Sequence, residues 1–230
     1  MTPANSAPQP PATVFIVDDD ASFLKSVSRL LRVAGHQVQT FDSAKKFLER
    51  PDQAAPGCVL ADLQMPGMDG LELQEALGRT SNPLPVIFMT GQGDIPTSVR
   101  AMRRGAEDFL TKLAPKEDLF AAVDRALRRN SQEEEQRRHR LELQTAFDEL
   151  SPREREVLQQ VVRGRMNKEI AADLKINLRT VKLHRTNLTR KLGLQSVAEL
   201  TRFAEAAGIF ETPQLQPEAP KVDGGCSTSG

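Results

Sequence analysis

Carboxylates stand directly after apolar runs at two places in the first half of the chain. Asp18, Asp19 and Asp20 follow TVFIV, and Asp62 follows GCVLA. Clustered carboxylates repel one another, and a hard cation such as Mg²⁺ relieves that repulsion because it prefers oxygen ligands. A cation also neutralises the charge that develops when one carboxylate attacks a phosphoryl group. These residue types therefore indicate metal-assisted phosphoryl transfer to an aspartate.

Two later positions carry side chains that suit the same chemistry. Thr90 follows PVIFM, and Lys112 comes shortly after DFL. A lysine ammonium can pair with a transferred phosphoryl oxygen, and a threonine hydroxyl can donate a hydrogen bond to another. Each residue alone also has an ordinary structural explanation, because Asp after a strand often forms a turn or caps a helix. Asp20, at the start of a helical pattern, is expected to be such a cap.

The elements that position these residues are an expected alternation of strands and helices. Apolar runs alternate with segments whose apolar residues recur at helical spacing. This order is typical of a doubly wound α/β fold with a five-stranded parallel sheet, which binds ligands beyond the carboxyl ends of its strands. The carboxylates, Thr90 and Lys112 would then meet at one crevice. The expected strands are TVFIV, QVQTF, GCVLA, PVIFM and DFL, and the expected helices cover residues 20–33, 43–48, 71–77, 95–102 and 119–127.

The second half of the chain predicts a separate all-α domain of four short helices. Ser151, followed by Pro152 and Glu154, forms a capping box with proline at the first helical position. Ser196 and Glu199 repeat the box. Between the two boxes lie helical patterns over 156–164, 167–174 and 178–193, and we expect Asn167 and Asn177 to cap the middle two helices.

The third of these helices combines an apolar face with a basic one. Residues 163–191 carry nine basic side chains and two acidic ones, a charge pattern typical of surfaces that bind phosphates. Apolar residues at 181, 188 and 192 would face a core, which leaves Lys182, Arg185 and Thr186 exposed. Two helices joined by a short turn are the helix-turn-helix plan, whose second helix enters the major groove of DNA. The alternative is that the basic residues only solvate a small bundle.

The remaining segments are a helical linker and two tails. Residues 129–147 contain no Gly or Pro and predict a long helix, although their apolar residues are too sparse for a dimerising coiled coil. Residues 1–12 and 211–230 are rich in Pro, Gly, Ser and Gln, a composition typical of disorder. The two folded domains are therefore expected over 13–128 and 148–210.

Composition limits the classes of site and the cellular location that we expect for this protein. The 31 basic and 31 acidic residues give a formal net charge of zero, so only the local distribution of charge points to a partner. Two cysteines, Cys58 and Cys226, are too few for a disulfide framework or a zinc cluster. No apolar run approaches the roughly 18 residues of a membrane span, and the N-terminus lacks the features of a signal peptide. We expect a cytoplasmic protein.

The first domain resembles the receiver domain of two-component response regulators. The stretches IVDDD, VLADLQMPGMDG, MTGQGD and DFLTK stand in the family's order and spacing. The resemblance implies that Asp62 is the phosphoacceptor and that a partner sensor histidine kinase is the phosphoryl donor. It further implies that Mg²⁺ is held by Asp19, Asp62, the main-chain carbonyl of Gln64 and, through water, Asp18. Thr90 and Lys112 would contact the phosphate, and Phe109 would be the aromatic that changes rotamer with Thr90.

One position departs from the family's pattern. Leu113 follows Lys112, where the family usually has a proline preceded by a cis peptide. A cis bond before a non-proline residue costs about 3 kcal/mol. Either the loop stores this strain, or the peptide is trans and the loop after Lys112 is displaced.

The second domain resembles the output domain of the NarL/FixJ family, also called LuxR-type. The stretch LSPREREVLQQVVRGRMNKEIAADLKINLRTVKLHRTNLTRKLG carries the likeness. It implies a transcription factor, not an enzyme, which binds promoter DNA, works with RNA polymerase and forms a homodimer when phosphorylated. The whole chain is most similar to the StyR and TodT type of the FixJ branch. The implied groove-facing residues are Thr180, Lys182, Leu183 and Thr186, and the residues implied near the DNA backbone are Lys168, His184, Asn187, Arg190 and Lys191.

Two rival functions remain open from the sequence. Asp18 and Asp20 have the Asp-x-Asp spacing of haloacid-dehalogenase phosphotransferases, in which the first Asp is the nucleophile and Asp62 would be spare. Alternatively, the protein could be a DNA-binding regulator whose first domain serves only as a scaffold, without control by phosphorylation.

Overall fold

The computed structural model describes residues 11–80, 82–91 and 95–209. They form two compact units that divide between Arg137 and Arg138. The tails predicted over 1–12 and 211–230 lie outside the described residues, except for residues 11 and 12.

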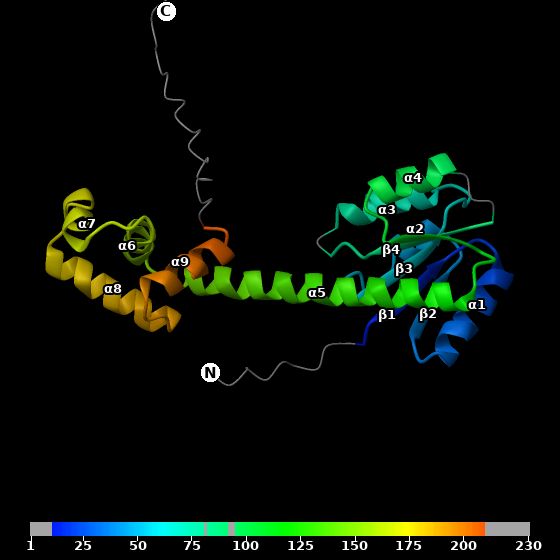
Figure 1. The fold of residues 1–230 in the computed structure, drawn as a ribbon, viewed down its shortest axis with the longest axis horizontal. Helices are drawn as coiled ribbons and strands as arrows, with labels where there is room; N and C mark the ends of the chain where they lie inside the picture. The colour runs from blue at the N-terminus through cyan, green and yellow to red at the C-terminus, as the bar shows by residue number, and fades with distance from the viewer. Residues whose placement is uncertain (1–10, 81, 92–94, 210–230) are drawn as a thin grey trace, which may run out of the picture. The chain divides into compact units, whose positions relative to one another are not determined.

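The first unit is built on a five-stranded parallel sheet in the order β2-β1-β3-β4-β5. Figure 1 shows the sheet among its flanking helices. The central strands β1, β3 and β4 are buried along their whole length, which explains why they read as unbroken apolar runs. The predicted strands and the predicted doubly wound fold are confirmed. The strands are β1 Thr13–Val17, β2 Gln37–Phe41, β3 Gly57–Asp62, β4 Val86–Thr90 and β5 Asp108–Thr111.

Helices cover both faces of the sheet. Leu24 and Leu31 of α1 pack with Val123 of α5 in one apolar cluster, while Phe47 of α2 and Leu73 of α3 belong to the cluster on the other face. The alternation of the two clusters along β1 follows from the opposite directions of successive side chains in a strand. The helices are α1 Ala21–Val33, α2 Ala44–Leu48, α3 Gly70–Gly78, α4 Ile95–Arg103 and α5 Lys116–Asp148.

The start of α1 separates Asp20 from its two acidic neighbours. Asp20 is the N-cap residue, and its Oδ1 accepts hydrogen bonds from the amides of Ser22 at 2.8 Å and Phe23 at 3.2 Å. The predicted capping role of Asp20 is therefore confirmed.

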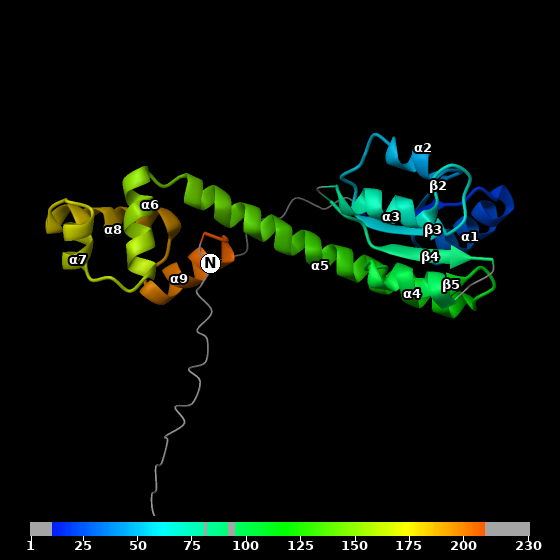
Figure 2. The same cartoon turned by 90° about the horizontal axis from the view of Figure 1, so that it is seen from above.

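Helix α5 continues without a break from Lys116 to Asp148 (Figure 2), so the helix expected for the linker is present. Its early turns pack on the sheet through Leu119 and Val123. Asn130, 2% exposed, then accepts a hydrogen bond from the Gly57 amide at 2.8 Å, which ties the helix to the start of β3.

The second unit contains four helices around one core: α6 Pro152–Val162, α7 Asn167–Asp173, α8 Leu178–Leu192 and α9 Val197–Ala206. Leu158, Val181 and Leu188 are fully buried in this core. The capping boxes predicted at Ser151 and Ser196 are both present. The four-helix architecture predicted for the second domain is confirmed.

One of the two predicted asparagine caps is wrong. Asn177 caps α8 by accepting a hydrogen bond from the Arg179 amide at 2.9 Å. The N-cap of α7, however, is Met166, and Asn167 is the first helical residue. The Asn167 amide oxygen accepts a hydrogen bond from Arg185 Nη1 at 2.7 Å instead, so it links α7 to α8.

No helix in the described part of the chain is both long enough and apolar enough to cross a membrane.

Gly70 offers a test of how the start of α3 supports the end of β3. A Cβ at Gly70 would lie 2.5 Å from the main-chain oxygen of Asp62 and 2.9 Å from the ring of Phe88, whereas a Cβ at Gly78 would meet nothing within 4 Å. We expect Gly70→Ala to lower the free energy of unfolding by about 1–3 kcal/mol, as overpacking does. The matched control Gly78→Ala should be neutral or stabilising by up to about 1 kcal/mol.

Scanning calorimetry measures both variants, since the chain has no Trp or Tyr for fluorescence. If Gly70→Ala unfolds at the wild-type temperature, the close approach of α3 to Asp62 is not a constraint on the fold.

Candidate functional site

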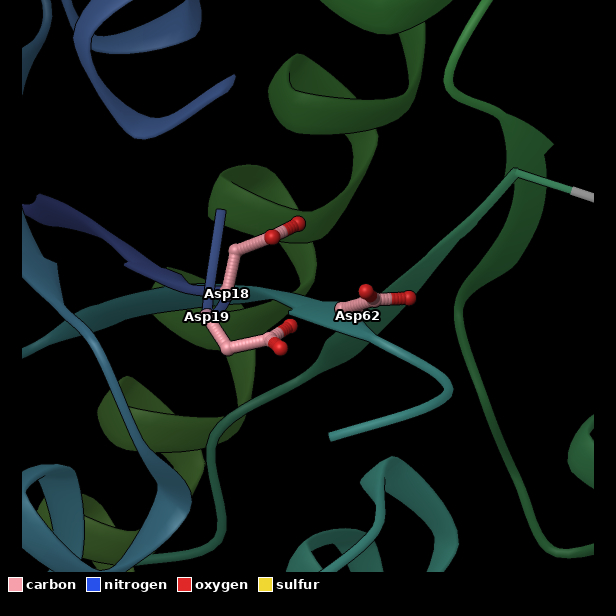
Figure 3. A group of neighbouring side chains, drawn as sticks. All are labelled: Asp18, Asp19 and Asp62. Carbon is pink, nitrogen blue, oxygen red and sulfur yellow. The ribbon is translucent and has the colours of Figure 1, made fainter. Parts of the chain in front are cut away.

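Three carboxylates meet beyond the carboxyl ends of β1 and β3 (Figure 3). Val17 of β1 pairs with Ala61 of β3, so Asp18 and Asp62, the next residues along the chain, lie side by side. Ligand oxygens of Asp18, Asp19 and Asp62 all lie within 4.8 Å of one another. Asp18 is 0% exposed, Asp62 is 8% exposed and Asp19 is exposed. The site therefore has a buried wall and an open side.

Lys112 closes the buried side of this cluster. Its Nζ lies 2.7 Å from Asp18 Oδ2 and donates a hydrogen bond to Asp62 Oδ2 at 2.9 Å. The Lys112 amide bonds to the Thr90 carbonyl at 2.8 Å, which fixes the base of the side chain. Burial lowers the pKa of Lys112, but its close contacts with the two negatively charged carboxylates outweigh this and raise the pKa. The lysine is thus a fixed positive charge between two aspartates.

The trans alternative for the peptide after Lys112 is the one observed. The described residues contain no cis peptide bond, and Leu113 points into solvent with 92% of its surface exposed. Lys112 nevertheless reaches both aspartates. Phe23 of α1 supports it from another side, because the ammonium lies 4.6 Å from the centre of the Phe23 ring, a cation–π contact.

The surroundings of Asp18 disfavour the ionised form of its carboxyl group. Burial raises its pKa most, the nearby charge of Asp62 raises it further, and the contacts with Lys112 and the Asp20 amide only partly oppose this. Its Oδ1 accepts a hydrogen bond from the Asp20 amide at 2.9 Å. Its buried Oδ2 receives no hydrogen bond of good geometry, although the Lys112 ammonium is close. The cluster therefore holds more negative charge than Lys112 neutralises.

These residues fit a Mg²⁺ ion. A hard cation takes carboxylate oxygens and retains several waters, and the site offers three carboxylates with one open side. Gln64 lies two residues after Asp62, and its amide donates a hydrogen bond to Asp62 Oδ1 at 3.2 Å. The turn that carries the Gln64 main chain is therefore attached to the cluster.

The two remaining candidates of the first unit lie on the neighbouring strands. Thr90 is the last residue of β4 and is 2% exposed. Phe109 lies on β5, is half-buried, and its ring centre is 6.5 Å from that of Phe88. The β4–β5 register pairs Phe88 with Phe109, so Phe109 sits two residue pairs back from the strand end that carries Thr90.

Sequence reasoning missed two residues that shape this site. Phe23 contacts Lys112 through its ring, but its helical spacing made it look like an ordinary core residue. Gly70 leaves room for the main-chain oxygen of Asp62. The only available signal for Gly70 was its place beside Asp69, the residue that caps α3.

The predicted DNA-contacting residues lie mostly on α8. Lys182, Leu183 and Thr186 are exposed, and Leu183 is 57% exposed although it is apolar. Thr180, His184 and Asn187 are partly buried, whereas Arg190 on α8 and Lys168 on α7 are exposed. Lys191 reaches another helix: its Nζ donates a hydrogen bond to Oε2 of the buried Glu154 on α6 at 2.7 Å.

Comparison with known proteins identifies both units. The Response regulator receiver domain family matches residues 14–124, and the family of Bacterial regulatory proteins, luxR family, matches residues 148–204. The response regulator protein TmoT of Ectopseudomonas mendocina is 41% identical over 84% of this chain and 88% of TmoT.

Two solved structures extend this likeness. A structure of the response regulator StyR is 44% identical, covers 85% of this chain and 99% of StyR, and gives a TM-score of 0.75. Full-length FixJ from B. japonicum is 36% identical, with 87% and 98% coverage and a TM-score of 0.53.

The raised pKa of Asp18 predicts that its charge costs stability when no cation is bound. When folding raises the pKa of an aspartate, the protein's free energy of unfolding falls as the pH rises from the ordinary pKa of the group, about 3.9, to the raised pKa. Asp18→Asn should therefore raise the metal-free unfolding temperature at pH 7 and have no such effect below about pH 3.9.

Mg²⁺ should stabilise the wild type more than it stabilises Asp18→Asn. At about 100 times its dissociation constant, the ion should stabilise the wild type by about 2.7 kcal/mol and stabilise Asp18→Asn by less. Asp20→Asn is the matched control, because Asp20 caps α1 and Asn caps equally well; it should behave as wild type in calorimetry with and without Mg²⁺. Equal responses to Mg²⁺ in Asp18→Asn and the wild type would contradict the assignment of Asp18 to the cation site.

Proposed function

The chain belongs to the response regulators that join a receiver domain to a LuxR-type DNA-binding domain, and on that premise we propose that phosphorylation of Asp62 by a partner histidine kinase controls its binding to promoter DNA. The observation that carries the proposal is the Lys112 ammonium, which lies 2.9 Å from Asp62 Oδ2 inside the carboxylate cluster. A phosphoryl group attached to Asp62 finds its counter-charge already in place.

The residues around Asp62 divide the work of phosphoryl transfer. An Asp62 carboxylate oxygen forms the new bond to phosphorus while the bond from phosphorus to the donor's histidine nitrogen breaks, and that nitrogen keeps the electron pair. Lys112 exchanges its contact with Asp62 for one with a phosphoryl oxygen. Asp19, Asp62, the Gln64 carbonyl and, through water, Asp18 would hold Mg²⁺, which would supply positive charge to the phosphoryl oxygens.

The signal then passes to the strands beside the site. Thr90 stands at the end of β4, next to β3, since Met89 of β4 pairs with Asp62. A Thr90 hydroxyl that turns to the phosphate leaves space that Phe109, one strand further, fills by changing rotamer. This reshapes the face made by α4, β5 and the first part of α5, and that face would form the homodimer.

The dimer would place two copies of α8 on DNA half-sites about one helical turn apart. Lys182, Leu183 and Thr186 are the exposed residues of α8 that would read base edges. Contacts with RNA polymerase would follow from binding at a promoter. We place this chemistry in the cytoplasm, where kinase, DNA and polymerase meet.

The dehalogenase-like rival fits the geometry less well. That mechanism needs Asp18 as nucleophile and Asp20 beside it as the acid. Asp18 is 0% exposed, and Asp20 accepts hydrogen bonds from the first turn of α1 instead of joining the cluster. Asp62, which would be spare in that mechanism, is 8% exposed and so the more accessible of the two carboxylates that Lys112 contacts.

Labelling with a small phosphoryl donor distinguishes the two nucleophiles. With phosphoramidate and Mg²⁺, we expect phosphate to be incorporated into the wild type, lost in Asp62→Asn and retained, at a lower rate, in Asp18→Asn. Intact-mass spectrometry at acidic pH measures the adduct. The reverse pattern, with label lost only in Asp18→Asn, would support the dehalogenase-like mechanism.

Promoter binding tests control by phosphorylation and the role of α8 together. Asp62→Asn should bind promoter DNA more weakly than the phosphorylated wild type, and Lys182→Ala should lose about 1–3 kcal/mol of specific binding if it contacts a base. Fluorescence anisotropy with labelled duplexes measures both. If Asp62→Asn binds and activates like the wild type under inducing conditions, the phosphorylation-independent rival is correct.

A further inference from the structure

We propose that Lys191 is a positioning residue that fixes the orientation of the recognition helix α8, and that it does not contact DNA phosphate. This inference rests on the proposed role of α8 in reading DNA. It reassigns a residue that the likeness to LuxR-type domains would place near the DNA backbone.

Lys191 is already engaged by two groups of the second unit. Its Nζ lies 2.7 Å from Glu154 Oε2 and 3.4 Å from the main-chain oxygen of Glu149. Glu154 belongs to α6 and Glu149 follows the last turn of α5. The ammonium therefore connects α8 to α6 and to the turn that follows α5.

The burial of Glu154 makes breaking its ion pair with Lys191 unfavourable. It is only 4% exposed, and its Oε2 also accepts a hydrogen bond from the Ser151 amide at 2.9 Å. Burial raises the pKa of Glu154, but the hydrogen bonds from Lys191 and Ser151 outweigh this and lower the pKa, so the carboxylate is ionised. A buried carboxylate without its counter-charge is strongly destabilising, and Lys191 would leave it so by turning to a phosphate.

A second cation completes the same junction. Arg155 donates hydrogen bonds from Nη2 to the Asp148 carbonyl at 2.7 Å and from Nε to the Leu150 carbonyl at 3.0 Å. Together with Lys191 it contacts three successive carbonyls, that of Asp148 at the end of α5 and those of the two residues that follow the helix. The C-terminal half of α8 is thus attached, through Lys191, to the segment where α5 ends and α6 begins.

The helical repeat of α8 places Lys191 on a different side of the helix from the residues that would read DNA. Lys191 follows Lys182 by nine positions, which is about two and a half turns of an α-helix. The two side chains therefore leave the helix on opposite sides. Thr186, four positions after Lys182, lies on the same side as Lys182, as expected for a common groove-facing surface.

Salt dependence distinguishes positioning from phosphate contact. Each phosphate contact contributes about 0.9 to the slope of log K against log salt concentration, whereas a positioning residue contributes nothing to that slope. The full-length protein, phosphorylated with phosphoramidate and Mg²⁺, is titrated with two probes at several salt concentrations. One probe is the duplex that the wild type selects most strongly from a random library, and the other is a length-matched scrambled duplex.

Lys191→Met should weaken binding to the selected duplex about tenfold, roughly the loss from one disturbed base pair. Its salt slope, and its affinity for the scrambled duplex, should stay at the wild-type values. A merely unfolded fraction would reduce binding to both duplexes equally, so the ratio of the two affinities isolates positioning. Lys191→Arg should restore most of that ratio.

Glu154→Gln gives a second route to the same result if Lys191→Met folds poorly. It frees Lys191 while keeping an oxygen that can accept the Ser151 hydrogen bond. If positioning is correct, Glu154→Gln lowers the affinity ratio as Lys191→Met does, and the double variant adds little to either single one. If Lys191 contacts phosphate, Glu154→Gln leaves the ratio unchanged or strengthens binding to both duplexes.

The inference is overturned if Lys191→Met lowers the salt slope by about 0.9 with equal losses on both duplexes, or if neither Lys191→Met nor Glu154→Gln changes the affinity ratio. Lys182→Met is the matched control on the exposed side of α8. It should change binding to the selected duplex; if it does not, the assignment of α8 as the recognition helix fails, independently of Lys191.

Discussion

The first unit depends on the repulsion among its carboxylates and on the one lysine that offsets part of it. Asp18 and Asp62 stand on adjacent strands, and without Lys112 their charges would oppose the pairing of β1 with β3. The ammonium lies within 3 Å of both and leaves a net negative charge that attracts a cation. Strand order, helix caps and the β5–α5 loop all serve to bring these three side chains to one edge of the sheet.

The elements around this edge were predictable because burial leaves a strong mark on sequence. Strands β1, β3 and β4 are covered on both faces and read as unbroken apolar runs. Asp20 could be separated from its neighbours because a carboxylate before a helical pattern is a cap. The site followed from the fold, since parallel strands bring their carboxyl ends to the same edge.

Side-chain contacts between different helices could not be predicted from the sequence. Asn167 stands where a cap is expected, but Arg185, eighteen residues away, holds its side chain. Lys191 belongs to a basic stripe by charge, yet it contacts Glu154, thirty-seven residues earlier. Helical periodicity gives the face of a residue and not its partner on another helix, so a cation near a helix end reads the same whether it contacts DNA or a carboxylate.

The same pair of groups serves two purposes in the two units, and the surroundings of the carboxylate decide which. Lys112 contacts aspartates at a site with an exposed side, Asp19, and under the proposed function an incoming phosphoryl group would take over the ammonium. Glu154 of α6 is only 4% exposed, and its Oε2 is shared between Lys191 of α8 and the amide of Ser151. No incoming anion can replace Glu154 without leaving its charge buried. A lysine–carboxylate pair at an open strand edge is therefore exchangeable, while the same pair inside a helix corner fixes geometry.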